Sequence, residues 1–337
     1  MALIMAEIIA VIGAGAWGTA LSLLLADKGH NMTLWMYEKD LAEETARTRE
    51  NRVYLPGFPL PASVTVTSSL EAAVRDKQFI LSVVPSHTVR TVTQQYAPLL
   101  RHDAVLISAS KGIELDTLMP LSEVFKDVLS AEFHARLCFL SGPSFAKEVA
   151  RKMPTAVALA SPDPSIGRKA QQVLSNDYFR VYTNRDVLGV ELAGALKNVV
   201  AIAAGVLEGM GFGYNTMAAL LTRGLAEMTR LGVAMGGSPT TFSGLAGMGD
   251  LVLTCTGGLS RNRTLGTRLG KGETLEDIMK GSATVAEGVK TAKAARDLAR
   301  KYRIDMPIVD EVYQLLYEGK DPKQALRDLM TRELKGE

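Results

Sequence analysis

The run Gly13-Ala14-Gly15-Ala16-Trp17-Gly18 places three glycines at Gly-x-Gly-x-x-Gly spacing near the start of the chain. A branched apolar run, residues 7–12, precedes it, and a helix-like run, residues 19–29, follows it. In such a strand–turn–helix unit, the glycines permit a tight turn and let a pyrophosphate approach the backbone at the helix N-terminus. The sequence therefore predicts a dinucleotide site at Gly13, Gly15 and Gly18.

The end of the second expected strand bears on which dinucleotide binds. An acid at this position would bind the adenosine ribose of NAD, whereas an arginine nearby would suit the extra phosphate of NADP. The chain passes through Trp35, Met36 and Tyr37 before it reaches Glu38 and Lys39, so neither group is plainly placed. Tyr37 is a candidate adenosine contact, with an ordinary strand-end aromatic as the alternative.

Two further strand ends carry candidate ligand groups, because ligands of doubly wound sheets gather at the carboxyl ends of strands. Lys111 follows the apolar run 104–110, where its ammonium could reach a bound anion, although loop lysines are usually solvated. Ser144 follows Gly142-Pro143 at an expected helix start. There it can cap the helix, bind a ligand, or do both.

Lys197 interrupts the apolar helical stretch 187–209, with Asn198 beside it. A buried lysine is costly unless it is paired or functional, and desolvation brings an amine toward the range useful for proton transfer. Glu191 lies six residues earlier, which is not a helical i−3 or i−4 spacing. The chemistry leaves two alternatives, a catalytic lysine and a structural lysine whose amine reaches solvent.

A glycine-rich run, residues 244–266, places Asp250 close in sequence to Ser260, Arg261 and Asn262. A guanidinium beside serine and asparagine suits a phosphate, while the alternative is a capped helix start with a solvated arginine. Cys255 has no neighbouring histidine, so we do not expect a thiol nucleophile. No Cys/His spacing suggests a metal, and none is expected.

The elements that would position these residues change type along the chain. Branched apolar runs alternate with helix-like stretches in the first half, a pattern typical of a parallel sheet with helices on both faces. From about residue 184, long alanine- and leucine-rich stretches with helical spacing replace it. We predict an N-terminal Rossmann-type, doubly wound, mainly parallel sheet over 1–186 and an all-helical domain over 187–337. The strands are expected at 7–12, 31–37, 79–84, 104–110, 136–140 and 155–161.

The composition excludes several other classes of protein. The 337 residues carry a net charge of +2, too small a field to favour nucleic acid or an anionic membrane. The uncharged run 8–26 is long enough to span a membrane, but its glycines divide it into a strand, a turn and a helix. Two cysteines make no disulfide framework, which favours a cytoplasmic protein. Long apolar helix faces are commonly buried against a second copy, so a homodimer is one expectation.

Together these motifs resemble bacterial NAD(P)-dependent glycerol-3-phosphate dehydrogenases. GAGAWGTAL, VPSH, SASKGIE, LSGPSFAKEV, ELAGALKNVVAIAAG, LAGMGDLVLTCTGGLSRNR and VAEGVKTA appear in the family's order from residue 8 to about residue 292. The resemblance implies reversible reduction of dihydroxyacetone phosphate to sn-glycerol 3-phosphate, for phospholipid synthesis, with NAD or NADP as the cofactor. The chain departs from the family at Met36-Tyr37-Glu38, where many bacterial members carry an arginine soon after the tryptophan.

The resemblance also implies roles for individual residues. Lys197 matches the family's proton donor and acceptor. The matched substrate contacts are Lys111, Gly142, Ser144, Lys197, Asp250, Ser260, Arg261 and Asn262. The matched or expected cofactor contacts are Gly13, Gly15, Ala16, Trp17, Gly18, Tyr37, Lys111, Ala146, Arg261, Val285 and Glu287.

Two other functions fit parts of the pattern. A related dehydrogenase acting on a β-hydroxy acid or a sugar acid phosphate would also use a helix lysine, but the Ser260–Arg263 segment suits a small phosphate better. A regulator that senses NAD(P)H without turnover has no use for a buried lysine and a phosphate clamp. Such regulators also often carry a basic DNA-binding module, which the sequence lacks.

Overall fold

The computed structural model describes residues 6–280, 286–334 and 336. Its contacts divide the chain into two compact units. The sheet unit comprises Met1–Lys111 and Met119–Glu191, and the helical unit comprises Gly112–Leu118 and Leu192–Glu337. Helix α8 (Val187–Gly209) begins in the sheet unit and continues into the helical unit. The predicted domain boundary between residues 186 and 187 stays a prediction.

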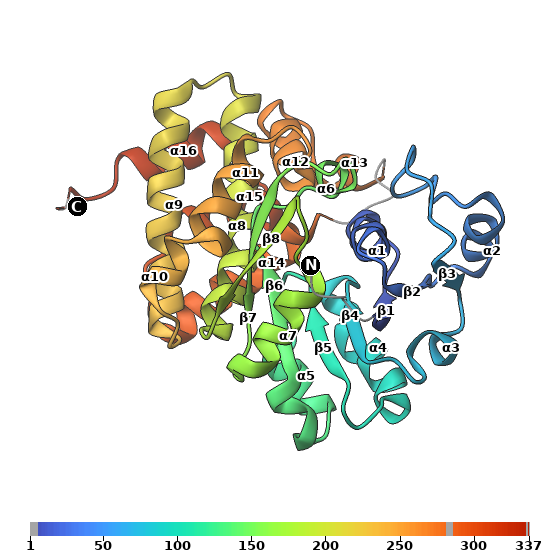
Figure 1. Cartoon of the computed structure of the whole chain (residues 1–337). Coiled ribbons are helices and arrows are strands. Elements are labelled where there is room, and N and C mark those ends of the chain that lie inside the picture. Colours follow the sequence, from blue (N-terminus) through green and yellow to red (C-terminus); the bar gives the residue numbers. More distant parts are fainter. Residues whose placement is uncertain (1–5, 281–285, 335, 337) are drawn as a thin grey trace. The chain divides into compact units, whose positions relative to one another are not determined.

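The sheet unit contains an eight-stranded sheet in the order β3-β2-β1-β4-β5-β6-β7-β8 (Figure 1). Neighbouring strands are parallel except for β6 and β7, which are antiparallel. The reversal of strand order around β1 and β4 confirms the predicted doubly wound, mainly parallel architecture. The strands are β1 (Ile8–Ile12), β2 (Asn31–Trp35), β3 (Val64–Thr67), β4 (Phe79–Ser82), β5 (Val105–Ser108), β6 (Leu137–Ser141), β7 (Thr155–Ala160) and β8 (Phe179–Asn184).

Helices cover both faces of this sheet, so the unit has two hydrophobic cores. On one face, Ile9 and Val11 of β1 join a core with helices α1 and α7. On the other face, Ala10 and Ile12 join a core with α3, α4 and α5. The alternation follows from the period of two in a strand, and it explains why β1 reads as a continuous apolar run.

The helical segments of the sheet unit connect successive strands. They are α1 (Ala16–Asp27), α2 (Lys39–Thr48), α3 (Leu70–Val74), η1 (Ser86–Thr88), α4 (Val89–Tyr96), η2 (Ala97–Leu99), α5 (Leu121–Val128), η3 (Ala131–Arg136), α6 (Ala146–Ala150) and α7 (Pro164–Leu174).

Two strands, β3 and β8, were not predicted from the sequence. Both lie at edges of the sheet, where one side of the strand lacks a neighbouring strand. Polar and exposed residues therefore alternate with buried ones, as in β8, where Phe179 and Val181 are buried and Arg180 and Tyr182 are exposed. The short VTVT and FRVYTN runs lack the apolar continuity that marked the central strands.

The described part of the helical unit contains helices and no strand, as predicted. After α8 come α9 (Tyr214–Ala234), α10 (Pro239–Phe242), the π-helical turn η4 (Leu245–Gly249), α11 (Asp250–Thr256), α12 (Arg261–Gly270), α13 (Leu275–Lys280), α14 (Glu287–Tyr302), α15 (Pro307–Tyr317) and α16 (Pro322–Met330). Helix α8 is long and apolar enough to cross a membrane, but 78% of its most apolar window is buried inside the protein.

Glycines let α8 and α12 approach to backbone contact. A Cβ on Gly205 or Gly209 of α8 would collide with backbone oxygens of α12, and a Cβ on Gly266 or Gly270 would collide with those of α8. Several glycines of the helical unit therefore have a packing function. The contact fixes α12 against the helix that carries Lys197.

Candidate functional site

The predicted dinucleotide turn lies between β1 and α1, at the carboxyl end of the central strand. Gly13 has φ +110°, which disfavours residues with a side chain, and a Cβ there would lie 2.8 Å from the Val83 carbonyl oxygen. Gly18 packs against the backbone of Gly13, so a Cβ has no room. At Gly15, in contrast, a Cβ would meet nothing within 4 Å. This open space beside the first N–H groups of α1, at Ala16 and Trp17, fits a pyrophosphate.

The side chain of Asn51 stabilises this turn by hydrogen bonds, and this residue was not predicted from the sequence. Its fully buried side chain donates from Nδ2 to the Ala14 carbonyl and to Thr19 Oγ1, both at 2.8 Å. Its Oδ1 accepts the Tyr54 backbone N–H at 3.2 Å. These hydrogen bonds fix the direction of the carbonyl of Ala14, the residue between the first two glycines of the turn. No local signal reveals them, because Asn51 lies 37 residues from Ala14.

Lys111, Gly142 and Ser144 come together at the ends of β5 and β6, and their roles as ligand contacts stay predictions. Lys111 Nζ donates to the Gly142 carbonyl at 3.3 Å, and Ser144 Oγ donates to the same oxygen at 3.0 Å. Gly142 has φ +140°, and a Cβ there would lie 2.9 Å from Val157 Cα. The suggestion that Ser144 caps the next helix is wrong, because Phe145 is the N-cap of α6 and provides no side-chain cap. Ala146 is the first residue of that five-residue helix.

In the helical unit, Lys197 is buried, and its partners come from a different helix. Its Nζ donates to Asp250 Oδ1 and to Thr254 Oγ1, each at 2.7 Å. Only 8% of the Lys197 side chain and 2% of the Asp250 side chain are exposed. The alternative of a lysine whose amine reaches solvent is therefore wrong. Glu191 is not a partner in this group, since its Oε1 accepts the Ser122 N–H at 2.9 Å.

A π-helical turn sets the position of Asp250. In η4, the Gly249 N–H donates to the Gly244 carbonyl at 3.1 Å, and α11 begins at the next residue. Gly247 lies against the backbone of Phe242, where a Cβ has no room. Such wider turns often occur at functional sites because they shift the register of the following helix. Here the following helix presents Asp250 and Thr254, four residues apart, on one face.

At the start of α12 the structure shows the capped helix start with an exposed arginine, and phosphate binding by the Ser260–Arg263 segment stays a prediction. Ser260 is the N-cap, and its Oγ accepts the Arg263 N–H at 3.2 Å, while Arg261 is exposed in the first turn. The buried Asn262 side chain donates to Asn198 Oδ1 and accepts the Gly288 N–H, each at 2.9 Å. This bridge joins three helices, α8, α12 and α14, beside Lys197. The role of the Asn262 side chain as a bridge was not predicted.

Three other predicted contacts have different outcomes. Tyr37 is 80% exposed and lies edge-on to Trp35, with ring centroids 6.2 Å apart. Glu287 is the first residue of α14, next to the Asn262 bridge. Val285 lies outside the described residues.

A reactive thiol at Cys255 or a group of metal ligands would be a second reactive centre in the part of the chain that the structure describes. Burial raises the pKa of the Cys255 thiol to about 12, which disfavours the thiolate that a nucleophile needs. Among those same residues, no three His, Cys, Asp or Glu side chains lie close enough to hold a metal ion.

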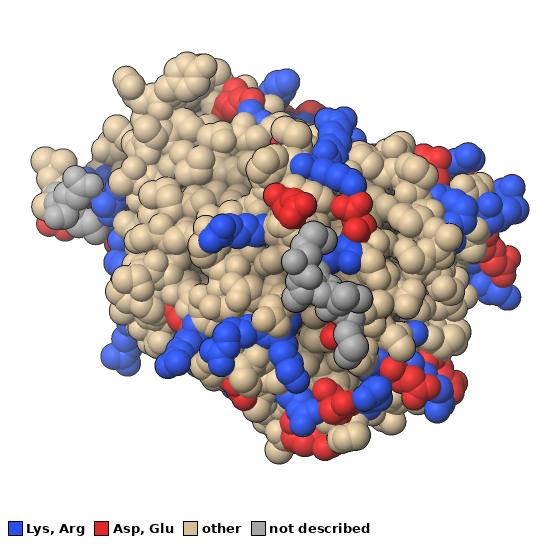
Figure 2. Space-filling model, in the orientation of Figure 1, with Lys and Arg blue, Asp and Glu red and all other residues tan. Residues whose placement is uncertain are grey.

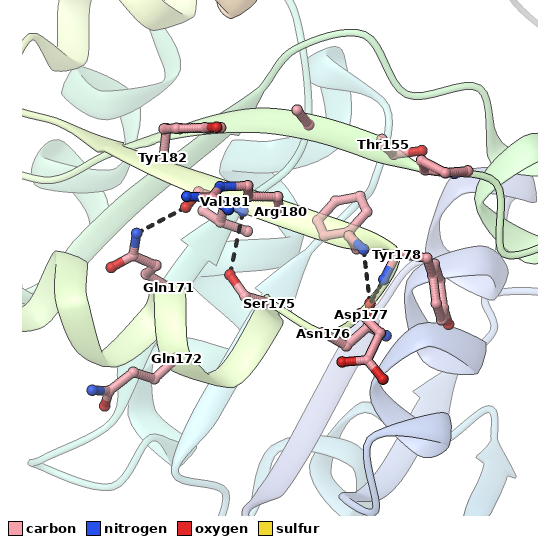
Figure 3. A pocket seen from close by; sticks show the side chains of 13 residues that line it. Thr155, Gln171, Gln172, Ser175, Asn176, Asp177, Tyr178, Arg180, Val181 and Tyr182 are labelled. Carbon is pink, nitrogen blue, oxygen red and sulfur yellow. Dashed lines mark hydrogen bonds between the residues drawn. The ribbon is translucent and has the colours of Figure 1, made fainter.

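A hollow of about 700 Å³ lies away from these motifs, along β8 and α7 (Figure 3). Side chains satisfy the outer edge of β8 there: Ser175 Oγ accepts the Val181 N–H at 3.2 Å, and Gln171 donates to the Val181 carbonyl at 2.8 Å. Asn176 Oδ1 accepts the Phe179 N–H at 2.8 Å. These bonds protect an edge strand from pairing with another chain, so the hollow has a structural explanation.

The sheet unit with its glycine turn and the helical unit with its buried lysine–aspartate pair define a dinucleotide-dependent oxidoreductase of the Rossmann type. Models of the NAD-dependent glycerol-3-phosphate dehydrogenase N-terminus and C-terminus match residues 8–167 and 186–327. The chain belongs to this family.

Individual relatives agree with this assignment. The chain is 56% identical over 333 residues to a glycerol-3-phosphate dehydrogenase [NAD(P)+] of Geobacter sp. (strain M21), with 99% of each chain covered. It is similar to the crystal structure of glycerol-3-phosphate dehydrogenase from Coxiella burnetii, with a TM-score of 0.93, 40% identity, and 97% and 99% of the two chains covered. A ketopantoate reductase from Ralstonia eutropha, at 15% identity, TM-score 0.61 and coverage of 95% and 99%, shares the fold alone.

Proposed function

We propose that this chain reduces dihydroxyacetone phosphate to sn-glycerol 3-phosphate, reversibly, with Lys197 as the proton donor and acceptor. The observation that carries the assignment of roles is the buried Lys197–Asp250–Thr254 group beside the start of α12, in a member of this family. The cofactor is NADH or NADPH, as in the relatives' names. The product is a precursor of glycerophospholipids.

The sheet unit binds the cofactor. The first N–H groups of α1, at Ala16 and Trp17, and the open space at Gly15 receive the pyrophosphate, and Tyr37 contacts the adenosine. Ala146, Arg261, Val285 and Glu287 are further proposed contacts. The bound nicotinamide supplies the hydride that reduces the ketone carbon.

Lys197 supplies what the substrate oxygen needs during reduction. As hydride reaches the carbon, negative charge grows on the carbonyl oxygen, and an ammonium can both stabilise this charge and donate a proton to it. Asp250 offsets the cost of burying that ammonium, and with Thr254 it fixes the direction of Nζ. In the oxidation direction, the neutral amine accepts the proton from the alcohol.

The start of α12 binds the substrate phosphate in this proposal. Arg261 contributes a planar set of charge-assisted donors, and the first backbone N–H groups of α12 favour an anion. Ser260 and Asn262 shape this end of the helix. Lys111, Gly142 and Ser144 of the sheet unit are proposed as further substrate contacts. Binding the phosphate orients the distant carbonyl, so that binding energy lowers the barrier to hydride transfer.

A substrate panel followed by NAD(P)H absorbance tests this function. We expect rapid oxidation of NADH or NADPH with dihydroxyacetone phosphate, and slow oxidation with unphosphorylated dihydroxyacetone. The panel also includes the keto acids that would be reduced to β-hydroxy acids, since these represent the related dehydrogenases that share the fold. A higher kcat/KM with such an acid, or cofactor binding without any turnover, would overturn the assignment.

We also propose that the protein is cytoplasmic and forms a homodimer through the helical unit. The support for a dimer is exposed apolar surface: Phe212, Tyr214 and Val233, at and near the ends of α9, are 44%, 94% and 45% exposed. Figure 2 shows a largely uncharged surface in the region where Figure 1 labels α9. Sedimentation velocity on the wild type and on Tyr214→Glu tests the proposal, and a monomeric wild type at micromolar concentration would refute it.

A further inference from the structure

Glu38 follows β2, the strand whose last residue contacts the glycine turn. Ile12 of β1 lies opposite Trp35 of β2, and the Gly13 N–H donates to the Trp35 carbonyl at 3.2 Å. From there the chain passes through buried Met36 and exposed Tyr37 to Glu38, the N-cap residue of α2. Glu38 therefore lies three residues beyond the strand position that contacts the turn. It also follows Gly18 by about 20 residues, the spacing at which Rossmann-type folds place a ribose-binding acid.

One loop, residues 49–60, contacts both the glycine turn and Glu38. Asn51 holds the Ala14 carbonyl of the glycine turn at 2.8 Å. Three residues later, the Tyr54 hydroxyl donates to Glu38 Oε1 at 3.2 Å. The Asn51 side chain also accepts the Tyr54 N–H, so the two contacts are linked through a single turn of backbone. The loop thus positions the pyrophosphate turn and the Glu38 carboxylate together.

Two of the cations near Glu38 are paired with acids. Lys39, the next residue in the chain, has its Nζ 3.9 Å from Glu43, and Arg52, in the loop that carries Tyr54, lies 3.4 Å from Glu50. Burial raises the pKa of Tyr54, and the nearby Glu38 charge adds to this shift, so the tyrosine remains a neutral donor. The exposed Glu38 carboxylate therefore gives this position negative character.

We propose that Glu38 selects NADH over NADPH by accepting hydrogen bonds from the adenosine ribose. This inference rests on the proposed function, because it concerns the cofactor of that reaction. A carboxylate can accept bonds from both ribose hydroxyls of NADH. A 2′-phosphate removes one donor and places negative charge against the carboxylate. Sequence alone left the preference open, because Met36 and Tyr37 separate Glu38 from the end of β2.

Direct titration of NADH and NADPH, by calorimetry or by cofactor fluorescence, tests this assignment independently of turnover. We expect the wild type to bind NADH at least about tenfold more tightly than NADPH, a difference equivalent to one charge-assisted hydrogen bond. Glu38→Gln should reduce this ratio at least about threefold, because the amide keeps the shape but removes the charge. Glu38→Arg should reverse the preference by supplying paired donors to the 2′-phosphate.

Glu44→Gln is the matched control, since it removes the same charge from an exposed position on α2 and should leave the ratio unchanged. Equal binding of NADH and NADPH by the wild type would overturn the inference. So would an unchanged ratio in both Glu38 variants. Selective NADH binding without reduction of dihydroxyacetone phosphate would instead refute the proposed function and leave the role of Glu38 standing.

Discussion

The two units build their candidate sites from different parts of the chain. In the sheet unit, the cofactor turn consists of backbone, and its glycines leave space for the ligand. In the helical unit, the site consists of buried side chains: Lys197 meets Asp250 across 53 residues of sequence and Thr254 across 57. A backbone site depends on a short contiguous motif. A side-chain site depends on the packing of helices that are far apart in the sequence.

This difference predicts how each site responds to substitution. The backbone site should be sensitive to added volume at its glycines. The side-chain site should be sensitive to the loss of single functional groups. The following substitutions test this contrast, with kinetic and binding measurements made on the same preparations.

Lys197→Met should have the largest effect. It removes the proton donor and the positive charge while keeping most of the side-chain volume, so kcat should fall by about 10² to 10⁴. The dissociation constant for the cofactor should change little, because the proposed cofactor turn lies in the sheet unit. Lys320→Met is the control, since Lys320 of the same unit is also paired with carboxylates, Glu311 and Asp328. Comparable kcat loss in both variants would show that Lys197 acts only through stability.

Arg261→Ala should affect substrate binding next most strongly. Loss of a charge-assisted contact to phosphate corresponds to about 1.5–3 kcal/mol, or a rise in KM of about 10- to 150-fold. The preference for phosphorylated over unphosphorylated dihydroxyacetone should fall with it. Arg268→Ala, on the same helix but paired with Glu273, should keep the wild-type KM. A wild-type substrate preference in Arg261→Ala would place the phosphate elsewhere.

Gly15→Val should weaken cofactor binding while the protein stays folded. Gly15 has φ −63° and an unobstructed Cβ direction, so the backbone tolerates a side chain that then occupies the space proposed for the pyrophosphate. We expect the dissociation constant for NAD(P)H to rise at least about tenfold. Gly213→Val is a matched control, because Gly213 also precedes a helix in extended conformation with open space at its Cβ. Unchanged affinity in Gly15→Val would contradict the assignment of the turn.

Glu227 should have the smallest effect on catalysis, because its contribution is to stability. It is buried on α9, its carboxylate accepts the Ile308 N–H at 2.9 Å, and burial raises its pKa to about 7. Between about pH 4.5 and 7, the folded protein then keeps a proton that the unfolded chain loses. The free energy of unfolding should therefore fall as pH rises through this range, by up to about 1.4 kcal/mol per pH unit, and level off above it.

Urea unfolding of the wild type and Glu227→Gln at several pH values measures this contribution. The glutamine keeps an acceptor for the start of α15 but cannot ionise, so its unfolding free energy should depend less on pH. Glu276→Gln, at an exposed position on α13, should keep the wild-type slope. Identical slopes in the wild type and Glu227→Gln would exclude Glu227 as the source.

The architecture followed from the sequence because its signals are local. The six predicted strands are present, and the central ones read as continuous apolar runs because helices cover both of their faces. The glycine turn was also predicted from a local signal, because the spacing of its glycines marks the positions at which a side chain is excluded. Edge strands β3 and β8 escaped prediction, because exposure on one side mixes polar residues into their patterns.

The partners of the functional groups were decided only by tertiary structure. Sequence marked Lys197 as unusual in an apolar helix, but a π-helical turn and helix packing determine that Asp250 and Thr254 meet its amine. Asn51 had no visible role until the fold placed it against Ala14, and Glu38 had none until the fold brought the Tyr54 hydroxyl within hydrogen-bond distance of it. Short-range patterns encode backbone conformation and burial, whereas a hydrogen bond between distant side chains depends on the packing of the whole unit.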